Sequence, residues 1–311
     1  MDVEALVAGV LAGERRAVAR AISAVEDGAP ELPVISAGIY ARTGGAATIG
    51  LTGAPGVGKS TLAGELVRAA REAGRTVAVL AVDPTSPYTG GALLGDRVRM
   101  QEHATDEGVF IRSMATRGHL GGMALAAPEA VRILDAAGYD LVIVETVGVG
   151  QAEVDVAAAT DTALVVLAPG LGDAVQMAKA GILEVADVFV VNKADRDGAG
   201  EVVRELRQML RLGPSRPWDP PVLTTAALER QGLTELWSAI EDHRTHLASS
   251  GDLDEKRRAR LLREVESLAA ERFRVRAAET LERDGGLVED LAARRIDPYA
   301  AAARLARGPS A

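Results

Sequence analysis

Short apolar runs rich in β-branched residues alternate with helical segments from about residue 46 onwards, and this alternation limits the possible folds most strongly. Several runs are apolar on successive residues, which is typical of strands covered on both faces. Strands that alternate with helices favour crossover connections, so we predict an α/β fold with a mostly parallel sheet. The predicted strands are Thr48–Thr52, Thr76–Asp83, Val109–Met114, Asp140–Glu145, Thr162–Leu167 and Val188–Asn192.

Helical extensions are expected on both sides of this α/β domain. Residues 1–44 form the first, with two short amphipathic helices within residues 1–28 and then a linker rich in Gly, Ala and Pro. The α/β domain covers residues 45–249, and a helical arm covers residues 250–311. The arm should hold a final helix after Asp297, where an acidic cap and a proline stand at the first turn. Its long helix, Asp252–Arg283, has an apolar face made by Leu261, Leu262, Val265, Leu268, Ala269 and Phe273.

A glycine-rich loop follows the first predicted strand and opens a helix, which is the context of a phosphate-binding loop. Its glycines let backbone amides approach phosphate oxygens, and the helix start adds partial positive charge. Lys59 would lie along the β- and γ-phosphates, with the Ser60 hydroxyl on Mg²⁺. A tight glycine turn is the alternative, but it would need neither of these side chains. The predicted nucleotide-binding residues here are Gly53, Ala54, Pro55, Gly56, Val57, Gly58, Lys59, Ser60 and Thr61.

Acidic residues end two of the predicted strands, at Asp83 and Glu145. Ligands of open α/β sheets bind at the carboxyl edge, where such carboxylates can hold Mg²⁺ or its waters. Asp96 is a further candidate, although an exposed helix cap explains it equally well. The segment with Gly148 and Gln151 suggests a loop that senses the γ-phosphate, with plain turn geometry as the alternative.

A motif that recognises the guanine base is indicated after the last apolar run, at Asn192, Lys193 and Asp195. The Asp195 carboxylate can accept two hydrogen bonds from guanine, whereas adenine offers no matching pair of donors. Ala226 and Ala227 follow a later apolar segment, and the backbone amide of one of them could donate a hydrogen bond to the guanine O6. We therefore predict GTP and GDP as ligands, with Mg²⁺.

Composition argues against several other classes of protein. With 44 acidic and 35 basic residues the net charge is −9, so nucleic acid is not the expected partner. No cysteine is present, which excludes thiolate metal sites and disulfides. His243 and His246 are expected to be solvated rather than metal ligands. Without a secretory signal or a long apolar run, the protein is expected to be cytoplasmic with no membrane contact.

Nearly the whole chain resembles one family, the GTPases associated with adenosylcobalamin-dependent methylmalonyl-CoA mutase (the MeaB/ArgK group), within the SIMIBI class of P-loop proteins. The segment Phe110–Gly122 is the most specific match. The other segments that carry the resemblance are Leu11–Arg16, Ile22–Asp27, Val82–Ser86, Gly95–Met100, Val144–Gln151, Lys179–Ile182 and Asp297–Tyr299. The chain departs from the family at Leu171, Ala174, Val175 and Ala226.

The resemblance implies specific roles. Lys59, Asp83, Asp96 and Glu145 would serve hydrolysis, and Ser60 would join the three carboxylates in binding Mg²⁺. Gln176 and Lys179 would lie on an additional switch loop that communicates with the mutase. The family forms homodimers through its C-terminal helices.

The leading interpretation is a GTP-hydrolysing chaperone that gates cofactor loading and protects an acyl-CoA mutase of the methylmalonyl-CoA type. The alternatives are a metal-delivery GTPase, a kinase acting on a transport-system protein, and a binding module without turnover. The absence of cysteine argues against metal delivery. No residue suggests itself as the catalytic base that a kinase would need.

Overall fold

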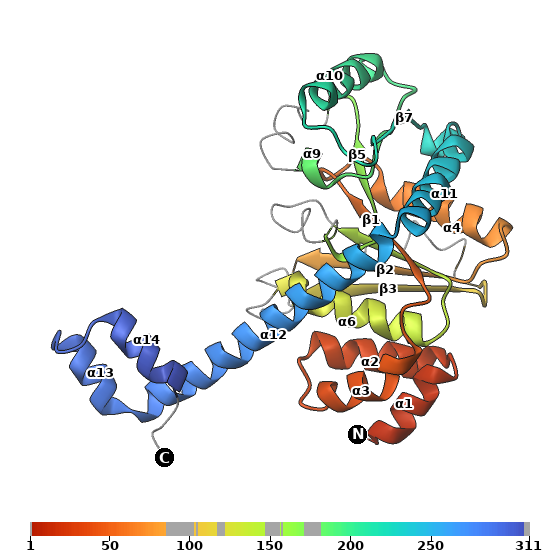
Figure 1. Ribbon diagram of the computed structural model, residues 1–311. Coiled ribbons are helices and arrows are strands. Elements are labelled where there is room, and N and C mark those ends of the chain that lie inside the picture. Colours follow the sequence, from red (N-terminus) through yellow and green to blue (C-terminus); the bar gives the residue numbers. More distant parts are fainter. Residues whose placement is uncertain are drawn as a thin grey trace. The chain divides into compact units, whose positions relative to one another are not determined.

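The computed structural model describes residues 2–84, 103, 105–116, 122–146, 156, 158–170 and 182–307. Side chains are described for these residues except 83, 84, 115, 116, 122–125 and 182. The chain forms two compact units, Met1–Arg260 and Leu261–Ala311. Figure 1 shows the elements of both in sequence colours.

A seven-stranded, all-parallel sheet forms the centre of the first unit, and this confirms the predicted fold class. Its order is β3-β2-β4-β1-β5-β6-β7. Most residues of the inner strands are buried, as their continuous apolar sequences predict. The strands are β1 (Ala47–Thr52), β2 (Val77–Pro84), β3 (Val109–Thr116), β4 (Leu141–Thr146), β5 (Thr162–Leu167), β6 (Val188–Val191) and β7 (Val222–Thr224).

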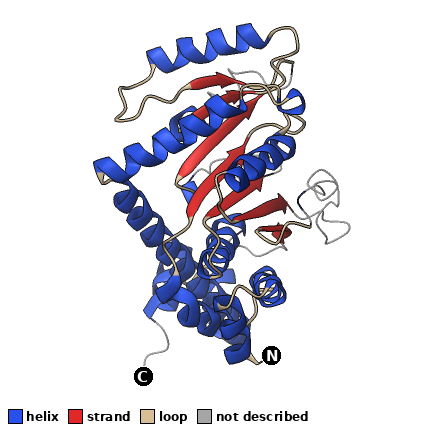
Figure 2. Cartoon of the chain, turned by 90° about the vertical axis from the view of Figure 1, so that its right-hand side faces the viewer, coloured by secondary structure: helices blue, strands red, loops and turns tan. Residues whose placement is uncertain are grey.

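Helices cover both faces of the sheet, as Figure 2 shows. On one face, α4 (Lys59–Glu72) and α11 (Leu233–Ser250) pack on Leu51, Ile143, Leu164 and their neighbours. These residues alternate along each strand with residues that face the opposite side, because successive side chains of a strand point to opposite faces.

The opposite face is covered by helices from three parts of the chain. α6 (Gly122–Ala136) packs on β2, β3 and β4 together with α1 (Val3–Leu11), α2 (Arg15–Glu26) and α3 (Leu32–Ile39). The N-terminal helices therefore share one apolar cluster with the sheet. α10 (Ala199–Leu212) packs on β5 and β6 in a separate cluster, and α9 (Ile182–Val185) lies beside it. Two short 3₁₀ helices, Tyr40–Arg42 and Ala227–Glu229, also belong to the described part of this unit.

The second unit contains most of α12 (Asp252–Arg283) and two shorter helices, α13 (Gly285–Ala292) and α14 (Pro298–Arg307). Leu287 and Ala301 are buried, and the two shorter helices contact each other. Asp297 accepts hydrogen bonds from the backbone amides of Tyr299 and Ala300, so the predicted acidic cap of the last helix is confirmed.

The apolar side chains predicted for the face of α12 are mostly exposed within the single chain. Val265 is 62% exposed and Leu262 is 57% exposed. Across both units, no helix among the residues that the structure describes is long and apolar enough to span a membrane.

The six predicted strands are confirmed to within one or two residues at their ends. Among the elements that were not predicted are a helix and a strand of the first unit, α3 and β7. The helix α3 lies in the expected linker, where Ile35 and Ile39 are fully buried and Pro33 stands in the first turn. The strand β7 has three residues and follows two prolines, so its pattern is too short to recognise. The division into residues 1–44, 45–249 and 250–311 remains a prediction.

Candidate functional site

The glycine-rich loop lies between the end of β1 and the start of α4, as predicted. Gly53 has a φ of 139°, and a Cβ atom there would come within 2.1 Å of the Val166 carbonyl oxygen. At Gly58, with a φ of 99°, a Cβ atom would come within 2.4 Å of the Asn192 side-chain nitrogen. Both positions therefore require glycine. Between them, Val57 is buried, while Pro55 and Gly56 are exposed.

The first turn of α4 begins at Lys59 and continues through Ser60 and Thr61. Amides in the first turn of a helix have no partner within the helix, so they point toward the loop and favour an anion. The Lys59 ammonium nitrogen is buried and donates to the carbonyl oxygens of Gly53 (2.7 Å) and Ala54 (3.0 Å). The loop thus gathers backbone amides and a fixed positive charge at one place.

Ser60 is connected to Glu145, the carboxylate at the end of β4. The Ser60 hydroxyl donates to Glu145 Oε1 at 2.6 Å, and both residues are buried. In the sheet register, Glu145 lies beside Leu51 of β1 and Ala81 of β2. Asp83 follows Ala81 by two residues, so the ends of all three strands meet at the carboxyl edge.

Asn192 connects the loop to the segment after β6. Its Nδ2 donates to the Val57 carbonyl oxygen at 2.9 Å, while its Oδ1 accepts from Thr225 Oγ1 (3.1 Å) and the Ala227 amide (3.2 Å). Lys193 has a φ of 57°, and its ammonium nitrogen donates to the Gly56 carbonyl oxygen at 2.6 Å. The two predicted motifs are therefore bound directly to each other.

The remaining predicted base contacts lie in the same region. Asp195 is exposed in the turn after Lys193. Ala226 and Ala227 are buried, and their amides donate to the Gln231 carbonyl oxygen and to Asn192 Oδ1. An Ala227 amide that contacts a base oxygen would have to share or release its bond to Asn192. The role of the Thr225 side chain as a brace of Asn192 was not predicted, because its sequence signals only a short turn.

Five predicted site residues lie outside the residues that the structure describes, namely Asp96, Gly148, Gln151, Gln176 and Lys179. For Asp83 the backbone is described and the side chain is not. The described part of the site therefore consists of the loop, Ser60 with Glu145, and the braced Asn192 segment. This arrangement can hold a phosphate chain on amides and an ammonium group, with carboxylate and hydroxyl oxygens beside it.

Comparison with known protein families identifies the family of this chain. The model of the family described as methylmalonyl Co-A mutase-associated GTPase MeaB matches residues 18–282. The chain belongs to this family. It is a P-loop GTPase, and its family implies a guanine nucleotide as the ligand of the loop.

Relatives of this MeaB-family GTPase cover most of its length. A protein of Pyrococcus horikoshii that is named as a GTPase is 48% identical over 304 residues, covering 96% of each chain. The GTPase ArgK of Escherichia coli is 42% identical, covering 79% of this chain and 77% of its own. The mitochondrial methylmalonic aciduria type A homolog of mouse is 39% identical, covering 67% of this chain and 52% of its own.

A solved structure has the same fold. The crystal structure described as an LAO/AO transport system kinase superposes with a TM-score of 0.72 at 29% identity, covering 98% of this chain and 96% of that one.

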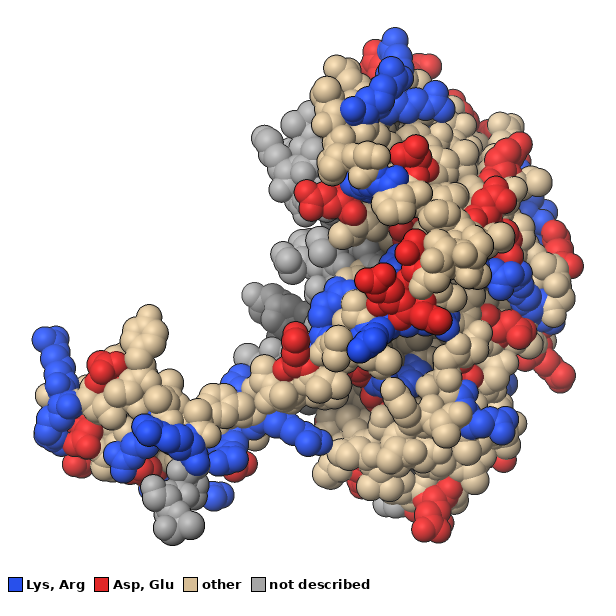
Figure 3. Space-filling model, viewed as in Figure 1, with Lys and Arg blue, Asp and Glu red and all other residues tan. Residues whose placement is uncertain are grey.

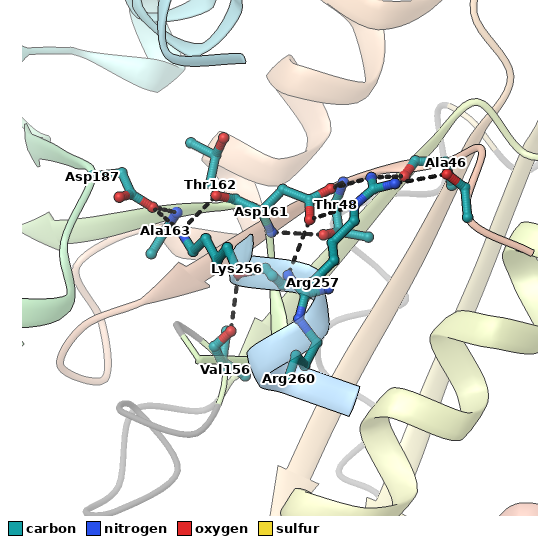
Figure 4. A network of polar contacts seen from close by, with 12 residues as sticks. Ala46, Thr48, Val156, Asp161, Thr162, Ala163, Asp187, Lys256, Arg257 and Arg260 are labelled. Atoms are coloured by element: carbon teal, nitrogen blue, oxygen red, sulfur yellow. Dashed lines mark hydrogen bonds and ion pairs between the residues drawn. The ribbon is translucent and has the colours of Figure 1, made fainter. Parts of the chain in front are cut away.

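A second polar network of the GTPase lies at the amino ends of β1 and β5, where the start of α12 is attached (Figure 4). The buried Asp161 forms ion pairs with Arg257 (2.7 Å) and Arg260 (3.0 Å) and exchanges hydrogen bonds with Thr48. Burial opposes ionisation of the carboxyl, but the two arginines outweigh it and hold the pKa of Asp161 below its usual value. Arg257 also donates to the Ala46 carbonyl oxygen, directly before β1.

His243 belongs to the same network and corrects the expectation of a solvated pair. Its side chain is 1% exposed. A hydrogen bond of 2.9 Å joins its Nδ1 to Thr162, and Asp187 lies 3.4 Å from its Nε2. Burial lowers the pKa of His243, although Asp187 acts in the opposite sense. The helical spacing of the two histidines gave no sign of this burial. The residues that cover His243 are distant in sequence, namely Thr162 of β5 and Trp218, which lies between α10 and β7.

Proposed function

We propose that this GTPase is a chaperone of an adenosylcobalamin-dependent acyl-CoA mutase of the methylmalonyl-CoA type. GTP hydrolysis would gate cofactor loading and protect the mutase from inactivation. The observation that carries the proposal is the match of residues 18–282 to a family described by its association with this mutase. A nucleotide-dependent switch of this kind requires a site that distinguishes GTP from GDP. The braced loop would supply the phosphate-binding half of that site.

The described residues suggest how hydrolysis is promoted. Phosphoryl transfer needs positioning and neutralisation of charge more than covalent chemistry. Lys59 would turn its ammonium group from the loop carbonyls to the β- and γ-phosphate oxygens, whose charge grows as the bond breaks. The loop amides would hold the phosphate chain in place. Glu145 would act at the γ-phosphate side, together with Asp83 and Asp96.

A magnesium ion fits the donors at this edge. Hard oxygen ligands are what Mg²⁺ prefers, and the Ser60 hydroxyl with the Glu145 carboxylate supplies two of them side by side. The hydroxyl groups of Thr52 and Thr146 are also buried here, without a hydrogen-bond partner among the described residues. We propose that Ser60, Asp83, Asp96 and Glu145 hold the ion or its waters, and the ion would neutralise phosphate charge.

A homodimer formed through the second unit is part of the proposal. The apolar side chains along α12 are exposed in the single chain. Packing them against a second copy of the chain would be favourable by about 25 cal/mol for each Å² of apolar surface that is buried. Val265→Asp should shift the protein toward the monomer in analytical ultracentrifugation. Glu266→Gln, at the next position, should leave the dimer intact. A protein that sediments as a monomer before any substitution would contradict the dimer.

The experiment for the chaperone role measures phosphate release from GTP with and without a purified adenosylcobalamin-dependent mutase from the same cell. We expect the mutase to accelerate hydrolysis by the GTPase, and an unrelated acyl-CoA enzyme to have no effect. Lys59→Ala serves as the control that assigns the released phosphate to this site. An unchanged rate, together with failure of the GDP- and GTP-analogue-loaded protein to retain any cobalamin enzyme from cell extract, would contradict the proposal.

A further inference from the structure

A hollow of about 600 Å³ lies at the β7 edge of the sheet, away from the glycine loop in the strand order. Its walls come from the last turns of α10, from the loop of residues 213–221, and from β7. Leu210, Val222 and Leu223 contribute apolar surface, and Pro214, Pro220 and Pro221 add to it. A hollow of this size with mostly apolar walls is typical of small-molecule sites.

Three arginines are among the residues that line this hollow, Arg207, Arg211 and Arg216. Among the residues that the structure describes, none of the three forms an ion pair with a carboxylate. Asp219 also lines the hollow, yet it is not paired with any of them. In Figure 3, Lys and Arg side chains gather over α10, on a chain whose net charge is −9. Uncompensated positive charge around a concave surface attracts an anion.

Hydrogen bonds to backbone carbonyl oxygens hold the walls of the hollow in place. Arg216 Nη2 donates to the Leu183 carbonyl oxygen of α9 at 2.8 Å, and Trp218 Nε1 donates to the Asp187 carbonyl oxygen at 2.8 Å. Arg207 Nη2 reaches the Val222 carbonyl oxygen at 3.4 Å. Prolines in the loop restrict its backbone further. A preformed site loses less conformational entropy when a ligand binds.

We propose that this hollow binds a small organic phosphate, with the phosphate on Arg207, Arg211 and Arg216 and an apolar group on Leu210, Val222 and Leu223. A phosphate dianion matches the planar fork of guanidinium donors, which can bind it through two parallel hydrogen bonds. Inorganic phosphate would use the arginines alone and would leave the apolar wall uncovered. The site is separate from the nucleotide loop, so both can be filled together.

The test is a calorimetric titration of the full chain, saturated with GDP and Mg²⁺ so that the glycine loop is filled. Phenyl phosphate is the probe, because it carries both a phosphate dianion and an apolar ring. We expect saturable binding that weakens as salt is added, and weaker binding of inorganic phosphate. Emission of Trp218, which lies beside Asp219 in the chain, gives a second readout.

Arg211→Gln is the most informative variant, because the Arg211 side chain makes no hydrogen bond or ion pair within the described chain and its loss should not disturb the fold. It should weaken phenyl phosphate about tenfold or more, since a hydrogen bond between charged groups is lost. Arg204→Gln, on the same helix but 77% exposed and outside the hollow, should bind as the unmodified protein does. Asp219→Asn should bind more tightly, because a like charge is removed.

Three outcomes would overturn the proposal. They are the absence of saturation at millimolar phenyl phosphate, equal weakening by Arg204→Gln and Arg211→Gln, and tighter binding of a glutamate-rich peptide than of phenyl phosphate. The last would assign the hollow to an acidic segment of a protein partner. GDP binding, measured in the same samples, verifies that each variant is folded.

Discussion

Buried polar groups have opposite roles at the two ends of the parallel strands, the carboxyl edge and the amino edge of the sheet. At the carboxyl edge, charges and hydrogen-bond donors gather at one place, supplied by the glycine loop, Lys59 and the Ser60–Glu145 pair. The glycines of the loop allow a ligand to approach its backbone closely. At the amino edge, Asp161 is enclosed by Arg257, Arg260 and backbone groups, so its charge is balanced by fixed protein partners.

The two ends of the strands thus differ in their expected roles, ligand binding at the carboxyl ends and stability at the amino ends. A buried charge that is balanced within the protein holds elements together, whereas donors gathered at a helix start favour a ligand. Changes at the carboxyl edge should therefore alter catalysis and leave stability nearly intact. Changes at the amino edge should do the reverse.

The largest expected effect is that of Lys59→Ala. We predict a loss of GTP hydrolysis on the order of 10³-fold, because a fixed positive charge at the transferred phosphate is removed. The free energy of unfolding, from urea denaturation without nucleotide, should change by no more than about 1 kcal/mol. Arg204→Ala, at an exposed position of α10, is the control, and equal rates of phosphate release in the two variants would contradict a catalytic role for Lys59.

Asp161→Ala should have the opposite profile. It leaves two arginines without their buried partner, so the free energy of unfolding should fall by about 3 kcal/mol. Hydrolysis per folded molecule, measured at a temperature where the variant is folded, should stay close to that of the unmodified protein. Glu255→Gln on the exposed side of α12 is the matched control. An intact urea midpoint in Asp161→Ala would show that the network does not stabilise the unit.

Asp195→Asn tests the specificity of the carboxyl edge. We predict about tenfold to hundredfold weaker GTP binding, because charge-assisted hydrogen bonds to the base are lost. Binding of xanthosine triphosphate should improve, since the new amide offers a donor to the changed base. The side chain is exposed, so stability should be unaffected. Competition binding with an unchanged order of preference would contradict the guanine contact.

The smallest effect concerns pH at the amino edge. The pKa of His243 is lowered in the folded state, so the unfolded chain binds more protons as the pH falls below about 6.5. Stability from this residue is complete above that pH and is lost below it. A full proton changes the slope by about 1.4 kcal/mol per pH unit, so His243→Asn should flatten the curve by a fraction of this. His246→Asn is the control, and equal slopes in both variants would refute the assignment.

Local patterns were sufficient for the sheet and for the loop. The strand runs, the glycine spacing and the Asn192 segment are each continuous in sequence, so their physical meaning can be recognised without a partner. What the sequence did not reveal depends on distant partners. Asp161 meets arginines nearly 100 residues later, His243 is covered by Trp218 and Thr162, and α3 is a helix because Ile35 and Ile39 find a buried surface.

A calorimetric titration of the folded protein with GDP and, separately, with ADP in magnesium buffer tests directly whether the glycine loop and Asp195 bind a guanine nucleotide. We predict saturable binding of GDP at the glycine loop and at least about 100-fold weaker binding of ADP, because adenine offers no pair of donors to the Asp195 carboxylate. Equal affinities, or no saturation with GDP, would contradict this prediction.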